Sequence, residues 1–157
     1  MRNLVTSIFL YACESWTLTD ELQRRIQAME MRCYRKILHI SCKDHVTNEE
    51  VRATIQQAIG PHEDLLTMVK RRKLQWYGHV FRSSGLAKPI LQGTVVGGKG
   101  QGRPRKRWED NIREWTGLEF AKFPEGSGKQ KRKRKTWRKL VVKSSVVPKR
   151  PPRLRAK

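Results

Sequence analysis

A long basic stretch without acidic residues limits how much of this chain can pack into a core. Residues 129–157 contain 14 Lys or Arg and no Asp or Glu. Residues 1–60 are nearly balanced, with eight basic and seven acidic side chains, whereas residues 61–157 carry 27 against seven. Repulsion among so many like charges opposes compact packing. We therefore expect one folded region over residues 1–120, followed by a basic, disordered tail over residues 121–157.

Hydrophobic periodicity predicts a mostly α fold, a small helical bundle with a short extended segment at residues 90–96. Residues 20–38, 47–60 and 63–81 place apolar side chains three and four positions apart. Thr19 suits the N-cap of the first of these helices, and Thr47 begins a capping box in the second. Gly78 weakens the third, because glycine costs about 1 kcal/mol relative to alanine in a helix interior.

A further short helix is predicted between Pro104 and Gly117, since proline suits the first turn of a helix and glycine its end. One face of this helix would hold its apolar side chains, Trp108, Ile112 and Trp115. A glycine-rich linker, residues 97–102, precedes it. The basic tail contains one isolated apolar group, formed by Trp137, Leu140 and Val141.

The net charge of +21 predicts binding to nucleic acid, because a polyanion relieves the repulsion and releases its condensed counterions. The residues expected to contact phosphate are Lys70, Arg71, Arg72, Lys73, Arg103, Arg105, Lys106, Arg107, Lys131, Arg132, Lys133, Arg134 and Lys135. The alternative is a solvated, solubilising tail. Residues 129–135 also match a nuclear-import signal, which would make an import receptor a second partner.

The Gly-Arg-Pro segment at residues 102–104 permits two kinds of contact. An extended backbone would let Arg103 and Arg105 enter the narrow minor groove of A·T-rich DNA. At a helix start, the same side chains would touch phosphate without reading sequence. We favour the second reading because phosphate contacts outnumber base contacts in most interfaces. Trp108 would add base stacking if it is exposed.

Cysteine and histidine usage gives no clear metal site. Three cysteines without paired spacing do not form a disulfide framework, which favours a reducing compartment. Zinc accepts the ligand types that crowd into 13 residues at the end of the first predicted helix and in the loop after it: Cys33, His39, Cys42 and His45. Their spacing matches no structural zinc pattern known to us, so we expect an ordinary polar loop and no metal or other cofactor.

The N-terminal apolar run, residues 4–13, is too short to span a bilayer and fits poorly before a signal-peptide cleavage site. We expect it to be part of a helix that begins upstream in a longer parent protein. A nuclear or cytoplasmic protein, neither secreted nor membrane-bound, is therefore expected.

Catalytic constellations are not apparent in the sequence. A polymerase needs clustered carboxylates to hold two metal ions at the transferring phosphate. The 14 acidic residues are scattered, no Asp-Asp pair occurs, and no Walker-type phosphate loop is present. His79 lies between Trp76 and Phe81 on a predicted helix, which favours a packed or hydrogen-bonded structural role over acid–base chemistry. We expect no enzymatic activity.

Four short segments follow one another along the chain: residues 11–18 (YACESWTL), 29–38 (MEMRCYRKIL), 71–82 (RRKLQWYGHVFR) and 102–112 (GRPRKRWEDNI). In this order they resemble the C-terminal part of reverse transcriptases from non-LTR (LINE-type) retrotransposons. The resemblance spans residues 11–120 and implies the helical thumb and downstream connection, which grip template and primer. The family's aspartate-bearing palm motif and its endonuclease domain have no counterpart here, so the resemblance implies no polymerase activity for this chain.

Charge, periodicity and resemblance together predict a non-catalytic, nucleic-acid-binding remnant of a retroelement reverse transcriptase, largely indifferent to sequence. Two alternatives remain open. One is a small protein-interaction module that binds its partner through the exposed tryptophans Trp76, Trp108 and Trp115. The other is a translation product of a decayed element without function, which circular dichroism and a cooperative melt would distinguish from a folded protein.

Overall fold

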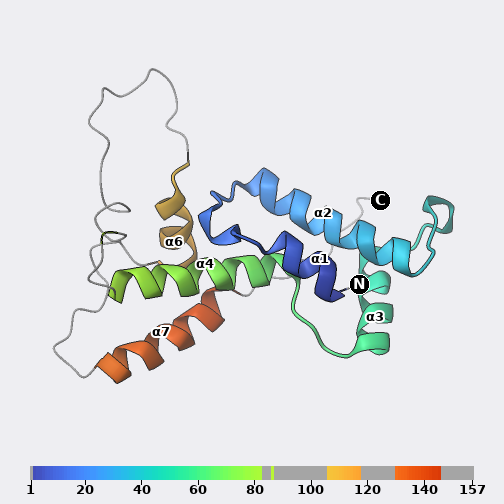
Figure 1. The fold of residues 1–157 in the computed structure, drawn as a ribbon. Coiled ribbons are helices and arrows are strands. Elements are labelled where there is room, and N and C mark those ends of the chain that lie inside the picture. The colour runs from blue at the N-terminus through green and yellow to red at the C-terminus, as the bar shows by residue number, and fades with distance from the viewer. Residues whose placement is uncertain (1, 83–85, 87–105, 118–129, 146–157) are drawn as a thin grey trace, which may run out of the picture.

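The computed structural model of the chain describes residues 2–82, 86, 106–117 and 130–145, and the side chains of residues 5–82, 86, 106–117 and 135–145. The fold is mostly helical, and no strand occurs within the described ranges (Figure 1). The α-helices and the two 3-10 turns are α1 (Arg2–Phe9), η1 (Cys13–Ser15), α2 (Asp20–Ile37), η2 (Cys42–Asp44), α3 (Asn48–Ile59), α4 (Leu65–Arg82), α6 (Trp108–Thr116) and α7 (Gln130–Ser145).

The three helices predicted from periodicity are confirmed within one or two residues at each end. Thr19 caps α2, because its side chain accepts a hydrogen bond from the backbone N–H of Leu22 at 3.3 Å. Thr47 and Glu50 form the predicted capping box of α3: each side chain accepts from the other's backbone N–H, at 3.3 and 2.9 Å. These caps explain why the sequence fixes the starts of α2 and α3.

Helix α4 runs through the middle of the molecule; α2 and α7 pack against it, and α3 packs against α2 (Figure 1). Its first half contacts η1 and α2, and its second half contacts α6 and α7. The first apolar cluster comprises Leu10, Cys13, Leu18, Ile26, Leu65, Leu66 and Val69. The second comprises Leu74, Tyr77, Phe81, Ile112, Trp137 and Val141. The core therefore consists of two apolar clusters, one at each half of α4.

The tail differs from the prediction, because residues 130–145 form helix α7 and pack against α4. Trp137 and Val141 are buried, at 5% and 3% exposure, in the second apolar cluster. Residues 121–129 and 146–157 lie outside the described residues. The expected disorder is thus wrong for the middle of the tail, because Trp137, Leu140 and Val141 share one helix face and bury it against α4.

Gly78 is the contact point between α4 and α7. A Cβ atom at this position would overlap the indole ring of Trp137. The indole Nε1 donates a hydrogen bond to the backbone oxygen of Leu74 at 3.2 Å. The glycine that weakens the helix prediction is therefore the residue that lets a tryptophan approach the α4 backbone, and this contact offsets its low helix propensity.

The start of α6 also differs from the prediction. Arg107 has extended backbone angles (φ −88°, ψ 161°), and its N–H donates to Asp110 Oδ2 at 2.6 Å, so the helix begins at Trp108. Pro104, the linker at 97–102 and the extended segment predicted at 90–96 lie outside the described residues. Gly117 ends α6 in the left-handed region (φ 67°), as predicted.

Two further features concern the sequence predictions. His79 is exposed on α4, so it is not the packed histidine that was one of the two structural roles predicted for it. The apolar run near the N-terminus contributes to helix α1. In the part of the chain that the structure describes, no helix is both long and apolar enough to cross a membrane.

Candidate nucleic-acid interface

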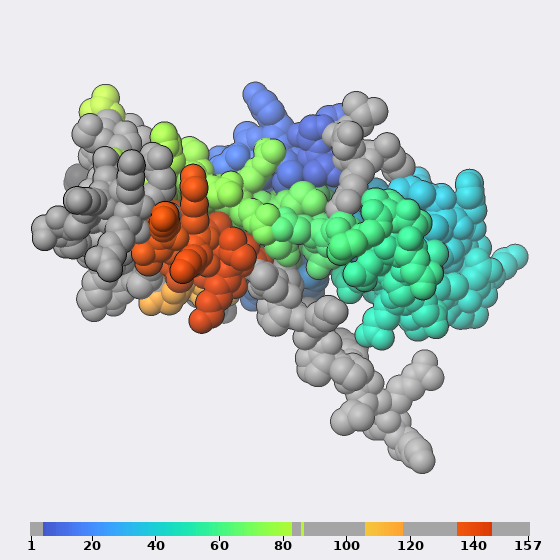
Figure 2. All heavy atoms as spheres, turned by 90° about the horizontal axis from the view of Figure 1, so that it is seen from below, coloured from blue at the N-terminus to red at the C-terminus, as the bar shows by residue number. Residues whose placement is uncertain are grey.

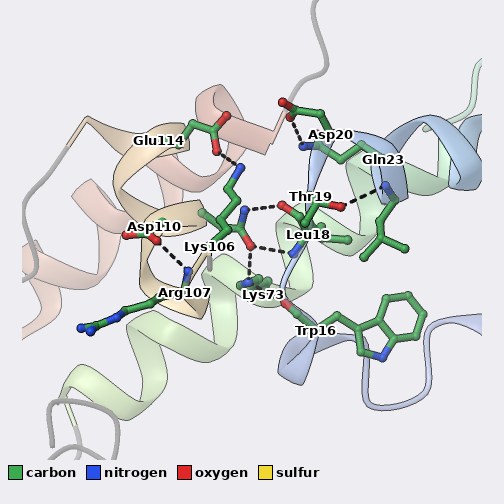
Figure 3. Close-up of polar contacts among 12 residues, drawn as sticks. Trp16, Leu18, Thr19, Asp20, Gln23, Lys73, Lys106, Arg107, Asp110 and Glu114 are labelled. Atoms are coloured by element: carbon green, nitrogen blue, oxygen red, sulfur yellow. Dashed lines mark hydrogen bonds and ion pairs between the residues drawn. The ribbon is translucent and has the colours of Figure 1, made fainter. Parts of the chain in front are cut away.

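Lys73 lies inside the fold, where α4 meets α6 and the segment after η1. Its side chain has no exposed surface, and Nζ donates hydrogen bonds to the Trp16 carbonyl (2.6 Å) and Asn111 Oδ1 (2.8 Å; Figure 3). Nζ also lies 4.5 Å from the ring centroid of Trp108, within cation–π range. Burial, with a smaller effect of the nearby Lys106 charge, lowers the pKa of Lys73 to about 7. The phosphate contact predicted for Lys73 does not fit this structure, because its ammonium group is enclosed.

Asn111 completes this junction and is a structural residue that sequence reasoning missed. Its Nδ2 donates to the carbonyl of Leu18 at 2.7 Å, and its Oδ1 accepts the Leu18 N–H at 2.8 Å (Figure 3). The amide thus satisfies both backbone groups of one buried residue, as a neighbouring strand would. This pairing fixes α6 against the start of α2 and holds the acceptor for Lys73 in place.

The other residues of the predicted α4 run are also engaged within the fold. Lys70 is 7% exposed, and its Nζ lies 5.1 Å from the ring centroid of Trp115. Burial lowers the pKa of Lys70. Arg71 forms an ion pair with Glu63. Burial of Lys70 leaves little of its ammonium group for phosphate, so the contact predicted for Lys70 does not fit the structure either.

Arg72, Lys106 and Arg107 lie nearer to solvent. Arg72 is exposed, and its Nη1 donates to the carbonyl of Leu10 at 3.1 Å. Lys106 is partly buried and pairs with Glu114 at 2.6 Å. The side chain of Arg107 is exposed and points away from the hydrogen-bonded cluster in Figure 3. Among the described members of these two predicted runs, Arg72 and Arg107 are therefore the exposed ones.

Helix α7 presents the densest set of exposed cations in the described part of the chain. Trp137 and Val141 face α4, whereas the exposed basic side chains on α7 are Lys135, Arg138, Lys139 and Lys143. Figure 2 shows α7, in orange and red, on the surface of the molecule. Sequence reasoning assigned only Lys135 of these four by name. The spacing of the apolar group at 137, 140 and 141 is the signal that would have placed the other three on an ordered outer face.

The remaining predicted contacts stay predictions. Arg103 and Arg105 lie outside the described residues. The backbone of residues 131–134 belongs to α7, which places the four basic positions Lys131, Arg132, Lys133 and Arg134 one turn before Lys135. Gln130–Ser145 carries eight Lys or Arg and no acidic residue.

The tryptophans on α4 and α6 are used mainly inside the fold. Trp108 Nε1 donates to the carbonyl of Glu14 at 2.7 Å, and its ring packs edge-on against Trp76 at a centroid distance of 5.4 Å. Trp115 packs beneath Lys70. Trp76 is 36% exposed. These contacts restrict base stacking by Trp108, and Trp76 is the exposed member of the three proposed protein-binding tryptophans.

The candidate zinc ligands lie in a fully described part of the chain. Cys33 is half-buried on α2, whereas the other three side chains, His39, Cys42 and His45, are exposed. Among the described residues, no three His, Cys, Asp or Glu side chains gather closely enough to hold a metal ion.

The exposed cations of α7 can attract an anionic polymer. The described side chains of α7 form no cluster of acid–base or nucleophilic groups of the kind that catalysis requires. No family model, curated protein or solved structure matches this chain.

Proposed function

We propose that this chain binds nucleic acid through the outer face of α7, largely without regard to sequence and without a catalytic step of its own. The observation that carries this proposal is a helix with exposed cations on one side and a buried tryptophan on the other. Trp137 anchors the helix to α4, so the cations are held in a fixed array.

The spacing of these cations suits contact with phosphates. Lys135, Lys139 and Lys143 follow one another at intervals of four residues, which places them about 6 Å apart along the helix axis. Lysine is a point charge with freely rotating donors, so it favours phosphate without discriminating among bases. Such contacts supply affinity that depends steeply on salt.

The resemblance to LINE-type reverse transcriptases, over residues 11–120, supports nucleic-acid binding by the chain but not its location on α7, which rests on charge. The thumb and connection of such enzymes grip template and primer, so a piece of that region would keep the grip without the polymerase chemistry. The predicted import signal at residues 129–135 is compatible with this proposal, since residues 130–135 form the basic start of α7. We accordingly propose a nuclear location, which a reporter fused to residues 129–145 tests directly.

The experiment that tests the proposal compares two triple variants of equal charge. In the first, Lys135, Lys139 and Lys143 on α7 are each changed to Gln. In the second, the control, three exposed cations around α2 and η2 are changed to Gln: Arg32, Lys36 and Lys43. Affinity for mixed-sequence duplex DNA and single-stranded RNA is measured at several salt concentrations.

The α7 variant is expected to lose affinity and to flatten the plot of log affinity against log salt by roughly 0.9 per lost duplex phosphate contact. The control is expected to change both quantities much less. Equal effects of the two variants would mean that net charge, not the α7 face, governs binding. A salt-independent affinity of the parent chain would contradict the proposal itself and favour a protein-interaction module.

A further inference from the structure

A second, different site lies between α1, α2, α3 and the start of α4. These helices enclose a pocket of about 320 Å³. Most of its lining is apolar, including Met29, Cys33, Ile55, Ile59 and Met68. Cavities of this kind with a few polar groups are the usual form of small-molecule sites. The pocket contains no residue of α7 or α6, so it is separate from the proposed nucleic-acid interface.

The charge of the lining is opposite to the charge of the chain. Among the lining residues are two carboxyl groups, those of Glu30 and Glu63, and no Lys or Arg. The whole chain has 35 Lys or Arg and 14 Asp or Glu. Glu63 is already paired with Arg71, whereas Glu30 has no ion-pair partner among the described residues. The pocket therefore favours a cation where most of the surface favours anions.

One carboxyl oxygen of Glu30 accepts hydrogen bonds within the fold, and the other accepts none among the described residues. The residue is 5% exposed, and its Oε1 accepts hydrogen bonds from the Leu65 N–H (2.9 Å) and the Tyr34 hydroxyl (3.0 Å). Tyr34 Oη lies 3.0 Å from His62 Nε2, so three polar side chains of the pocket lining are linked by hydrogen bonds. Glu30 Oε2 is buried and accepts no hydrogen bond within the described part of the chain. A buried acceptor without a donor is costly, and a ligand donor would relieve that cost.

We propose that this pocket binds a small organic amine, with its apolar body among the aliphatic and methionine side chains and its ammonium group donating to Glu30 Oε2. Two groups near Glu30 act on the same carboxyl in opposite directions: Asp64 favours its protonation and Arg52 its ionisation. Burial raises the pKa of Glu30, and a bound ammonium group would favour the ionised form.

The test uses the full chain and three probes that share one ring system: 1-naphthylmethylamine, 1-naphthalenemethanol and 1-naphthoic acid. Binding is measured by calorimetry at one pH and salt concentration. The net charge of +21 predicts tightest binding of the acid if association is merely electrostatic. The proposal predicts the opposite order, with the amine bound about tenfold more tightly than the alcohol or the acid, because charge-assisted hydrogen bonds are the stronger kind.

Two variants and a control locate the site. Glu30→Gln keeps an acceptor for the Leu65 N–H but removes the negative charge, so it is expected to abolish the amine's advantage. Ile59→Trp narrows the pocket from a position that is 56% exposed, so it leaves the buried network intact and weakens all three probes. Glu49→Gln removes an exposed carboxylate on α3 outside the pocket lining and is expected to change nothing.

Several results would overturn the proposal. They are absence of amine binding, equal affinity for the three probes, or an unchanged amine preference in Glu30→Gln. Should Glu30→Gln fail to fold, full-strength amine binding by Ile59→Trp would equally refute the site. None of these outcomes bears on nucleic-acid binding by α7, since the pocket and that face share no residue.

Discussion

The ammonium group of Lys73 connects three parts of the chain that are distant in sequence. It is hydrogen bonded to the Trp16 carbonyl before α2 and to Asn111 on α6, while its own backbone belongs to α4. Burial lowers its pKa to about 7, far below the usual 10.5 for lysine. A buried base of this kind makes folding depend on pH in a range where few other groups titrate.

The sign of this dependence follows from proton binding. Between pH 7 and pH 10.5 the unfolded chain keeps the proton on Lys73 and the folded chain loses it, so this group adds stability as the pH rises. We expect the free energy of unfolding of the parent to rise between pH 7 and 8.5 relative to Lys73→Met, by up to about 1.4 kcal/mol per pH unit. Urea denaturation of both proteins at constant ionic strength measures the difference. Parallel pH profiles would contradict the lowered pKa.

Asn111 supports a second prediction at the same scale. Asn111→Ala removes three hydrogen bonds and leaves the buried N–H and carbonyl of Leu18 without their side-chain partner. Unsatisfied buried polar groups are costly, so we expect a loss of about 2–4 kcal/mol in the free energy of unfolding. Gln57→Ala, at an exposed position on α3, is the control and should change stability by less than about 0.5 kcal/mol. A loss in Asn111→Ala no larger than in the control would show that water replaces the amide.

Residue-level roles of the basic run at 70–73 could not be predicted from charge alone. All four side chains look alike in sequence, yet burial separates them. Positions 70 and 73 continue the apolar stripe of Leu66, Val69 and Tyr77 at helical spacing, so periodicity contained the distinction. Periodicity could not predict which groups accept hydrogen bonds from Lys73, because Trp16 and Asn111 come from distant segments.

Among the elements, α2, α3 and α4 were predictable because each carries its own start signal or a continuous apolar stripe. Helix α7 was not predicted, because its apolar face, from Trp137 to Val141, is little more than one turn long and lies within a run of like charges. The stabilising partner is Gly78, 59 positions before Trp137, and nothing local in the sequence announces that contact. The candidate interface was predictable as a charge density, but its orientation depends on this one long-range contact.

Gly78→Ala tests the docking of α7 directly. Alanine raises helix propensity by about 1 kcal/mol, yet its Cβ would overlap the indole of Trp137. Overpacking of a well-packed core costs about 1–3 kcal/mol, so we expect a net loss of stability and faster amide hydrogen exchange in α7, with little change in α2 and α3. Gln75→Ala, on the exposed side of α4, is the matched control. Unchanged exchange in α7 would mean that the tryptophan does not pack against Gly78.

On the scale of the whole molecule, the two halves of α4 differ in the charge of the segments that pack around them. The first half of α4 packs against parts of the nearly neutral segment, residues 1–60, and borders the pocket that contains Glu30 and Glu63. The second half packs against α6 and the basic helix α7. A fixed α7 presents its cations as an array, and a pre-formed array loses less conformational entropy on binding than a free segment. The docked position of α7 and the charge of its cations are therefore expected to contribute separately to the affinity for nucleic acid.

Variants that release α7 from α4 without changing the net charge are expected to affect affinity but not its salt dependence. Gly78→Ala and Trp137→Ala leave the net charge unchanged but release α7, so both should weaken binding to duplex DNA by about tenfold at every salt concentration. The slope of log affinity against log salt should stay close to that of the parent, because the number of phosphate contacts is set by the same lysines. The Gln triple variant of α7 should do the reverse and change the slope itself. Affinity in Gly78→Ala equal to that of the parent would show that the basic residues act as a free chain, and that the docked helix is not the binding surface.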